Sequence, residues 1–126
     1  MGKSSPSWIN GAEAAAPAAG TQLVKVVVTA GRIGKISGAR IVSQEVNAAG
    51  KGWRVRANIQ GTSVIAFDLD VTNPSAISDY PFFTLKGNGF DFFEIVNAVA
   101  GTAGTVHQAS FLYDEEEISP AERYDH

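Results

Sequence analysis

The sequence WRVRANIQGTSVIAFDLDV, residues 53–71, alternates two kinds of side chain on either side of a Gln60-Gly61 step. Before the step, the apolar side consists of Trp53, Val55, Ala57 and Ile59. After the step, the corresponding side consists of Ser63, Ile65, Phe67, Leu69 and Val71. A period of two residues is typical of a strand with one buried face, and a short step containing glycine is typical of a hairpin turn. The stretch therefore predicts an antiparallel hairpin with Trp53 in the core.

A lone hairpin is marginally stable in water, so the rest of the chain must cover its apolar face. Further strands are predicted where β-branched and aromatic residues lie between turn signals rich in Gly, Pro and Asn. These strands cover about residues 22–29, 39–46, 81–87, 90–99 and 105–114. The sequence therefore predicts an all-β, single-domain antiparallel β-sandwich, immunoglobulin-like or jelly-roll, with about seven or eight strands.

The two ends of the chain differ from this body. Residues 1–20 are rich in Ser, Ala, Gly and Pro, and Trp8 and Ile9 are their main large apolar residues. Such a segment buries too little surface to offset its ordering entropy alone. We therefore expect an extended N-terminal arm over residues 1–20, a β-sandwich domain over 21–113 and an acidic C-terminal tail over 114–126.

Length and composition exclude several classes of protein. A chain of 126 residues with 44% apolar and 18% charged residues fits one globular domain. No run approaches the roughly 20 apolar residues of a membrane span, and the first residues lack the apolar centre of a secretion signal, so no membrane partner is expected. The sequence contains no cysteine, which excludes disulfides, thiol nucleophiles and cysteine metal ligands.

The net charge of −3 hides an uneven distribution. Residues 25–56 contain seven basic side chains and one acid, whereas residues 68–94 contain five acids and one lysine. The tail from Asp114 onward adds six acids and one arginine. The net charge gives no reason to bind nucleic acid, but oppositely charged regions can attract copies of the same chain. The alternative is that both regions are ordinary solvated faces.

The candidate partner-binding residues come from the arm and from the basic half of the chain. They are Trp8, Ile9, Arg32, Lys35, Arg40, Arg54 and Arg56. Trp8 is the expected anchor, because tryptophan and arginine are the residues that most often dominate binding energy at protein interfaces.

Asp68 and Asp70 are the candidate metal ligands, because residues two apart on a strand point to the same face. Together with Asn73 or Asp79 from the following loop, they could supply oxygen ligands for calcium. A zinc site is not expected, since His107 and His126 are the only histidines. The alternative is a pair of ordinary surface carboxylates, and no cofactor is expected.

The sequence does not gather catalytic groups. Asp91 and Glu94 have an odd spacing, which sends them to opposite faces of a strand. No GxSxG nucleophile motif is present, and the Gly31-x-x-Gly34 spacing lacks the Lys-Ser/Thr of a phosphate-binding loop. The sequence therefore predicts that the protein is not an enzyme. An enzyme with a cavity inside a barrel is the least favoured alternative.

Six aromatic residues lie between positions 80 and 93, which is more than one core layer can easily hide. Any that remain exposed would mark a protein interface. The competing use is a sugar-binding platform with Asn58, Gln60 and Asn88 as polar neighbours.

The favoured function is that of a non-enzymatic structural or assembly protein, for example a virion decoration protein. It would dock on identical or neighbouring subunits through its arm and its oppositely charged surfaces, forming a homo-oligomer or a larger assembly. The alternative is a carbohydrate-binding β-sandwich module with a glycan as its partner.

Overall fold

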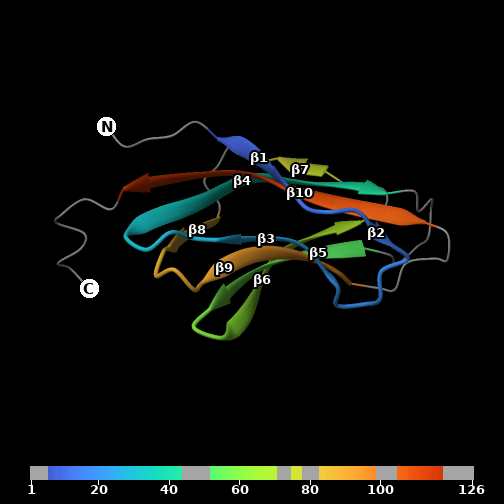
Figure 1. The fold of residues 1–126 in the computed structure, drawn as a ribbon, viewed down its shortest axis with the longest axis horizontal. Coiled ribbons are helices and arrows are strands. Elements are labelled where there is room, and N and C mark those ends of the chain that lie inside the picture. The colour runs from blue at the N-terminus through green and yellow to red at the C-terminus, as the bar shows by residue number, and fades with distance from the viewer. Residues whose placement is uncertain (1–5, 44–51, 71–74, 78–82, 99–104, 118–126) are drawn as a thin grey trace.

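The computed structural model describes residues 6–43, 52–70, 75–77, 83–98 and 105–117, and these form ten strands in two antiparallel sheets packed face to face (Figure 1). The six-stranded sheet consists of β1 (Ser7–Asn10), β2 (Ala14–Ala15), β4 (Arg32–Ser43), β7 (Ser75–Ile77), β8 (Phe83–Lys86) and β10 (Val106–Glu117). The four-stranded sheet has the order β3 (Gln22–Val27), β9 (Phe92–Asn97), β5 (Gly52–Ile59) and β6 (Thr62–Asp70). The predicted β-sandwich is confirmed. No helix long and apolar enough to cross a membrane occurs in the described ranges.

Three short strands extend the predicted set. β1 and β2 lie within the predicted N-terminal arm, and β7 lies in a stretch expected to be a loop. Each pairs with one of the two long strands: β1 and β2 with β10, and β7 with β4. Backbone hydrogen bonds form these ladders whatever the side chains are, so low apolar content does not prevent such pairing. β10 also continues to Glu117, into the predicted acidic tail.

The predicted hairpin is β5 and β6, joined by Gln60 and Gly61 with φ angles of 52° and 86°. Two consecutive positive φ angles are typical of the tight turn that matches the twist of two strands. On β5, Trp53 and Val55 are buried, as the alternation predicts. On β6 the predicted face is wrong at Ile65, because a bulge opposite Val55 and Arg56 shifts the register. Ile65 therefore lies opposite Arg56, on the outer face, and is exposed.

The core lies between the sheets, and its largest side chains make contacts from one sheet to the other. Trp53 of β5 is 1% exposed, and its Nε1 donates a hydrogen bond to Nδ1 of buried His107 on β10, over 3.2 Å. The Phe93 ring of β9 lies edge-on to the rings of Phe111 and Tyr113 on β10, with 6.4 Å between centroids in each pair. The prediction that Trp53 lies in the core is confirmed.

Candidate functional site

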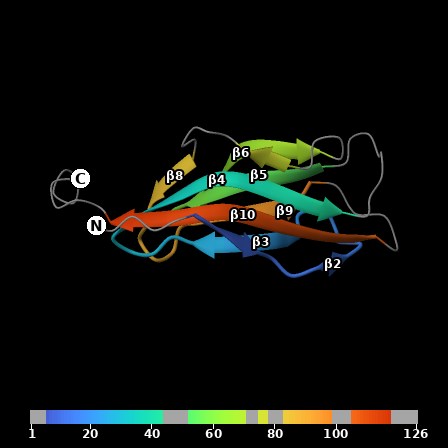
Figure 2. The ribbon, with the colours of Figure 1, turned by 90° about the horizontal axis from the view of Figure 1, so that it is seen from above.

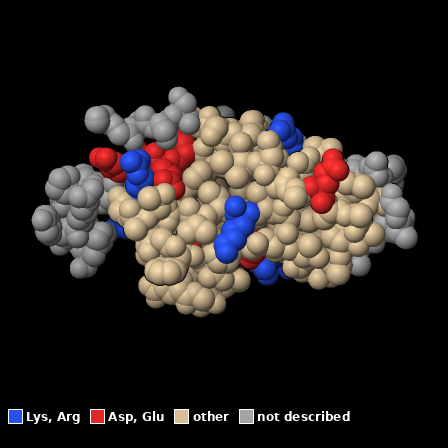
Figure 3. Space-filling view, viewed as in Figure 1, with Lys and Arg blue, Asp and Glu red and all other residues tan. Residues whose placement is uncertain are grey.

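The predicted basic surface and acidic tail meet within one sheet. Lys35 and Arg32 on β4 lie opposite Asp114 and Glu117 on β10. Figure 3 shows acidic and basic side chains gathered at one end of the molecule, over the strands that Figure 1 labels β4 and β10. Opposite charges on neighbouring strands attract each other, so much of this potential is neutralised within the chain.

Glu115 at this end of β10 is held by specific hydrogen bonds. Its Oε2 accepts one from the Tyr113 hydroxyl over 2.6 Å and one from the Thr29 backbone N–H over 3.0 Å. Burial opposes ionisation of Glu115, but these hydrogen bonds and the Arg32 charge outweigh it and hold its pKa below the ordinary value. Burial and the hydrogen bond to Glu115 raise the pKa of Tyr113, which therefore remains a donor. The arrangement ties the β3–β4 turn to β10.

Arg56 forms an ion pair on the outer face of the four-stranded sheet. Its Nη2 and Nε lie 2.9 and 3.1 Å from Glu94 Oε2, and Gln22 Nε2 donates to Glu94 Oε1 over 2.7 Å. The Glu94 side chain is 7% exposed and that of Arg56 is 29% exposed. Glu94 is thus a carboxylate satisfied by its own chain. It lies apart from Asp91, which accepts a hydrogen bond from the Gln60 N–H.

Arg54 lies opposite Asp68 in the β5–β6 register. The side chains of the candidate metal ligands Asp68 and Asp70 lie outside the described residues, as do Asn73 and Asp79 of the following loop. The described part of the chain brings together no group of three or more His, Asp or Glu side chains suited to a metal ion.

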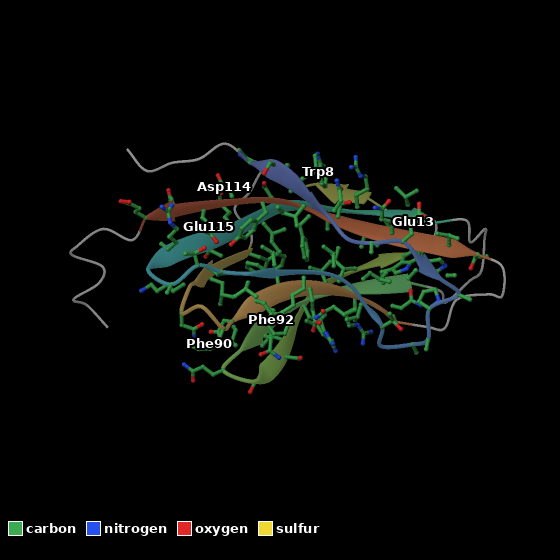
Figure 4. The ribbon with its side chains drawn as sticks, in the orientation of Figure 1. Trp8, Glu13, Phe90, Phe92, Asp114 and Glu115 are labelled. Atoms are coloured by element: carbon green, nitrogen blue, oxygen red, sulfur yellow. The ribbon has the colours of Figure 1, made fainter. Side chains whose placement is uncertain are left out.

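Trp8, Ile9 and Arg40 make contacts within their own domain. Ile9 faces inward and packs against the core. Trp8 lies on the outer face of the six-stranded sheet, where Figure 4 labels it, and the Arg40 guanidinium lies 4.1 Å from its ring centroid. This cation–π contact joins β1 to β4 across β10.

Exposed apolar side chains gather at one end of the four-stranded sheet. In the described part of the chain six large apolar residues are exposed, and five of them belong to this sheet or to the turn before β9. We name these five residues the hairpin-end patch: Val27, Ile59, Val64, Ile65 and Phe90. The ends of the four strands meet there, since Val27 lies opposite Phe92, Phe92 opposite Asn58, and Asn58 opposite Ser63.

Phe90 is the most exposed member of the hairpin-end patch, at 81%. Asn88 Oδ1 accepts hydrogen bonds from the backbone N–H groups of Phe90 and Asp91, both over 2.8 Å. Asp91 Oδ1 in turn accepts from the Gln60 N–H over 3.0 Å, which ties this turn to the hairpin. Figure 4 shows Phe90 and Phe92 on the lower side of the molecule, close to the β5–β6 turn.

A shallow hollow of about 530 Å³ lies beside Phe90, between the β5–β6 turn and the end of β8. It is lined by Ile59, Gln60, Leu85, Lys86, Gly87, Asn88 and Asp91. The lining combines apolar residues with the amides Gln60 and Asn88 and the charged Lys86 and Asp91, so the hollow can hold a ligand by packing and hydrogen bonding.

Sequence reasoning identified only part of this surface. It singled out Phe90 within the aromatic cluster and the amides Asn58, Gln60 and Asn88, which the fold brings to one end of the sheet, whereas Tyr80 and Phe82 of that cluster lie outside the described residues. It missed Val27 and Ile65, because their exposure depends on which strands cover them. The Asn88-Gly89 turn signal directly before Phe90 was the available indication that this aromatic residue leaves the strand.

Comparisons of this chain with protein-family models, with curated proteins and with solved structures found no match.

Proposed function

We propose that the protein is a non-enzymatic assembly module, and that the hairpin-end patch docks on the same patch of a second copy. The observation that carries the proposal is the gathering of Val27, Ile59, Val64, Ile65 and Phe90 at one end of the sandwich. Ile65 lies opposite Arg56 on the outer face of the sheet and Val64 lies opposite Ala57 on the other face, so these apolar side chains surround the end of the sheet on both faces. Exposed apolar side chains that gather in one region of a small domain often mark an interaction site. In Figure 3 this lower end of the molecule carries few charged side chains, so docking there removes little charge from water.

The fixed position of Phe90 supports the same proposal. Its backbone N–H donates to Asn88 Oδ1, so the backbone that carries the ring is already held in place before a partner arrives. A turn whose backbone is ordered before binding costs less conformational entropy on association. A patch of five side chains is smaller than a stable interface of about 1,200 Å² or more, so we expect weak self-association, with a Kd on the order of 100 μM.

Sedimentation equilibrium over a range of protein concentrations tests this proposal. Phe90→Ser and Ile65→Ser should each weaken self-association by about tenfold or more, since each removes apolar area from the contact. Val42→Ser is the matched control, because Val42 is 61% exposed but lies on β4 of the other sheet. Equal effects of Phe90→Ser and Val42→Ser, or a chain that stays monomeric at millimolar concentration, would contradict the proposal.

Glycan recognition is the second candidate function, favoured by a hollow lined by the amide residues Gln60 and Asn88, next in sequence to the exposed Phe90. An aromatic ring packs on a sugar face, and amides hydrogen-bond its hydroxyl groups. A glycan array separates the two functions. Gln60→Ala should abolish glycan binding and leave self-association unchanged, whereas an array with no signal would contradict the glycan function alone.

A further inference from the structure

The N-terminal edge segment, Ser7–Ala15, runs along β10 and pairs with it in an antiparallel ladder. The register pairs Ser7 with Tyr113 at one end and Ala15 with Val106 at the other. Between them, the Gly11 N–H donates to the Ala109 carbonyl over 2.8 Å, and Gln108 Nε2 donates to the Gly11 carbonyl over 2.7 Å. None of these hydrogen bonds lies within the segment, so the same segment of another copy could make all of them.

The segment lies at one edge of the sandwich, paired with β10 and in contact with β3. Ile9 and Ala14 pack inward against the core, and Figure 2 shows β1 and β2 on the side of the molecule where β3 lies. A Cβ atom at Gly11 would collide with the Leu23 carbonyl oxygen of β3, so only glycine permits this close approach. This edge of β10 and β3 therefore fits this one stretch of sequence, and the same stretch of a second copy would fit it equally well.

The residue that follows the segment has the properties of a hinge. Ala16 has a φ of 42°, a conformation that strains a residue with a Cβ atom, and it precedes Pro17. The chain after Ala16 is fixed to its own body, because Asn97 Nδ2 donates to the Pro17 carbonyl over 2.9 Å and the Gly20 N–H donates to the Asn97 carbonyl over 2.7 Å. Ala16 therefore lies between residues 17–20, which are fixed to their own domain, and the segment Ser7–Ala15, whose contacts a second copy of the chain could make.

We propose that two copies of the chain exchange their N-terminal edge segments, each segment completing the six-stranded sheet of the other copy. Opening at Ala16 relieves its backbone strain, while every contact of the segment is recovered in the partner. Short hinges under strain favour this kind of exchange, and mutual exchange gives a closed two-fold dimer. The exchange uses β1 and β2 of the six-stranded sheet, which contain no residue of the hairpin-end patch, so it does not rest on docking through that patch.

The absence of cysteine from the chain permits a direct test. Asn10 and Ser110 are partners in the β1–β10 register, with 2.7 Å between Asn10 Oδ1 and Ser110 Oγ, so cysteines placed there can form a disulfide. The variants Asn10→Cys and Ser110→Cys are mixed in urea, refolded together and oxidised. Exchange predicts a disulfide-linked dimer of one Asn10→Cys and one Ser110→Cys chain on a non-reducing gel, amounting to roughly half of the protein for random pairing.

The matched control is the pair Lys35→Cys and Asp114→Cys, which are partners between β4 and β10, lie outside both the exchanged segment and the hairpin-end patch, and should give no mixed dimer. A mixture of Asn10→Cys and Ser110→Cys that gives no more mixed dimer than this control would overturn the exchange, provided that the double variant Asn10→Cys/Ser110→Cys forms its disulfide within one chain.

Ala16→Gly tests the hinge. Glycine adopts a positive φ without strain, so this substitution should lower the fraction of mixed dimer at least twofold. An unchanged fraction would overturn the role of Ala16. Phe90→Ser in the same background should leave the mixed dimer unchanged, which separates a failure of the exchange from a failure of patch docking.

Discussion

The two sheets of this sandwich present their outer surfaces in different ways. On the six-stranded sheet, Arg32 and Lys35 lie opposite acidic residues of β10, and the β10 edge is occupied by the segment Ser7–Ala15. On the four-stranded sheet, the Glu94–Arg56 cluster lies beside the uncovered hairpin-end patch. Formal charge along the sequence is therefore a poor guide to docking surfaces, because antiparallel pairing can bring opposite charges side by side.

The largest loss of stability is expected when the contact between Trp53 and His107, which joins the two sheets, is removed. Trp53→Ala removes the indole between β5 and β10 and leaves a cavity, so we expect it to lower the free energy of unfolding by about 3–5 kcal/mol. Trp53→Phe keeps most of the ring and loses the hydrogen bond to His107, for which we expect about 1–3 kcal/mol. Urea unfolding followed by far-UV circular dichroism measures both values.

Phe90→Ala is the control for loss of an aromatic ring, because Phe90 is exposed and should change the free energy of unfolding by less than about 0.5 kcal/mol. If Trp53→Ala and Phe90→Ala had similar effects, the contact between Trp53 and His107 would not be what joins the sheets.

The charged residues on the outer surfaces of the two sheets should contribute unequally to the free energy of unfolding. Arg56→Ala leaves the nearly buried Glu94 carboxylate with Gln22 as its remaining partner, so we expect a loss of about 2 kcal/mol. This value is below that of a fully buried pair, because Arg56 is 29% exposed. Lys35→Ala, on the other sheet, removes a charge from a more solvated pair of strands and should cost less than about 1 kcal/mol.

Chemical denaturation of both variants at low and high salt gives the comparison. The effect of Lys35→Ala should shrink in salt, whereas that of Arg56→Ala should persist, because buried charges are screened less. If Arg56→Ala and Lys35→Ala lowered the free energy of unfolding equally at both salt concentrations, the charges on the two surfaces would be equally screened, and the expected difference would be wrong.

The sequence predicted those parts of the fold that depend on neighbouring residues. Trp53 and Val55 follow from alternation along β5, and the turn follows from Gln60 and Gly61, since both signals are local. Ile65 was assigned to the wrong face because a bulge is a property of two paired strands and is not encoded by one of them. The pairing of β4 with β10 joins residues about 80 positions apart, so the position of Lys35 opposite Asp114 could not be predicted from either segment alone.

The hairpin-end patch could be predicted only in part, because the exposure of its residues depends on pairing between strands that are distant in the sequence. Alternation places Phe93 and Phe92 on opposite faces of β9, and the burial of Phe93 confirms this. Alternation alone does not predict whether another part of the chain covers the face of β9 that carries Phe92. β1 and β2 were not predicted as strands because Ser, Ala and Gly have weak strand propensity, whereas their hydrogen bonds to β10 come from the backbone.

The smallest predicted effect concerns Glu115, which closes one end of the six-stranded sheet. Its pKa in the folded protein is below the ordinary value of 4.5, because hydrogen bonds from Tyr113 and the Thr29 N–H, with Arg32 nearby, outweigh the cost of burial. A lowered carboxyl pKa means that the unfolded chain binds the proton more tightly, so this contribution to stability is present above pH 4.5 and is lost as the pH falls through the folded pKa.

Glu115→Gln should therefore lower the free energy of unfolding by about 0.5 kcal/mol at pH 7, a modest value because the carboxylate is partly solvated. At pH 3 the difference between Glu115→Gln and the unaltered protein should be smaller, since this pH lies below the ordinary carboxyl pKa of 4.5, where the unfolded chain already binds the proton. Glu116→Gln removes the same formal charge from the next residue of β10 and controls for net charge. If Glu116→Gln caused the same loss, the effect would come from net charge and not from the hydrogen bonds of Glu115 with Tyr113 and Thr29. If the Glu115→Gln difference were as large at pH 3 as at pH 7, it would not depend on ionised Glu115. Either result would reject the role of these hydrogen bonds.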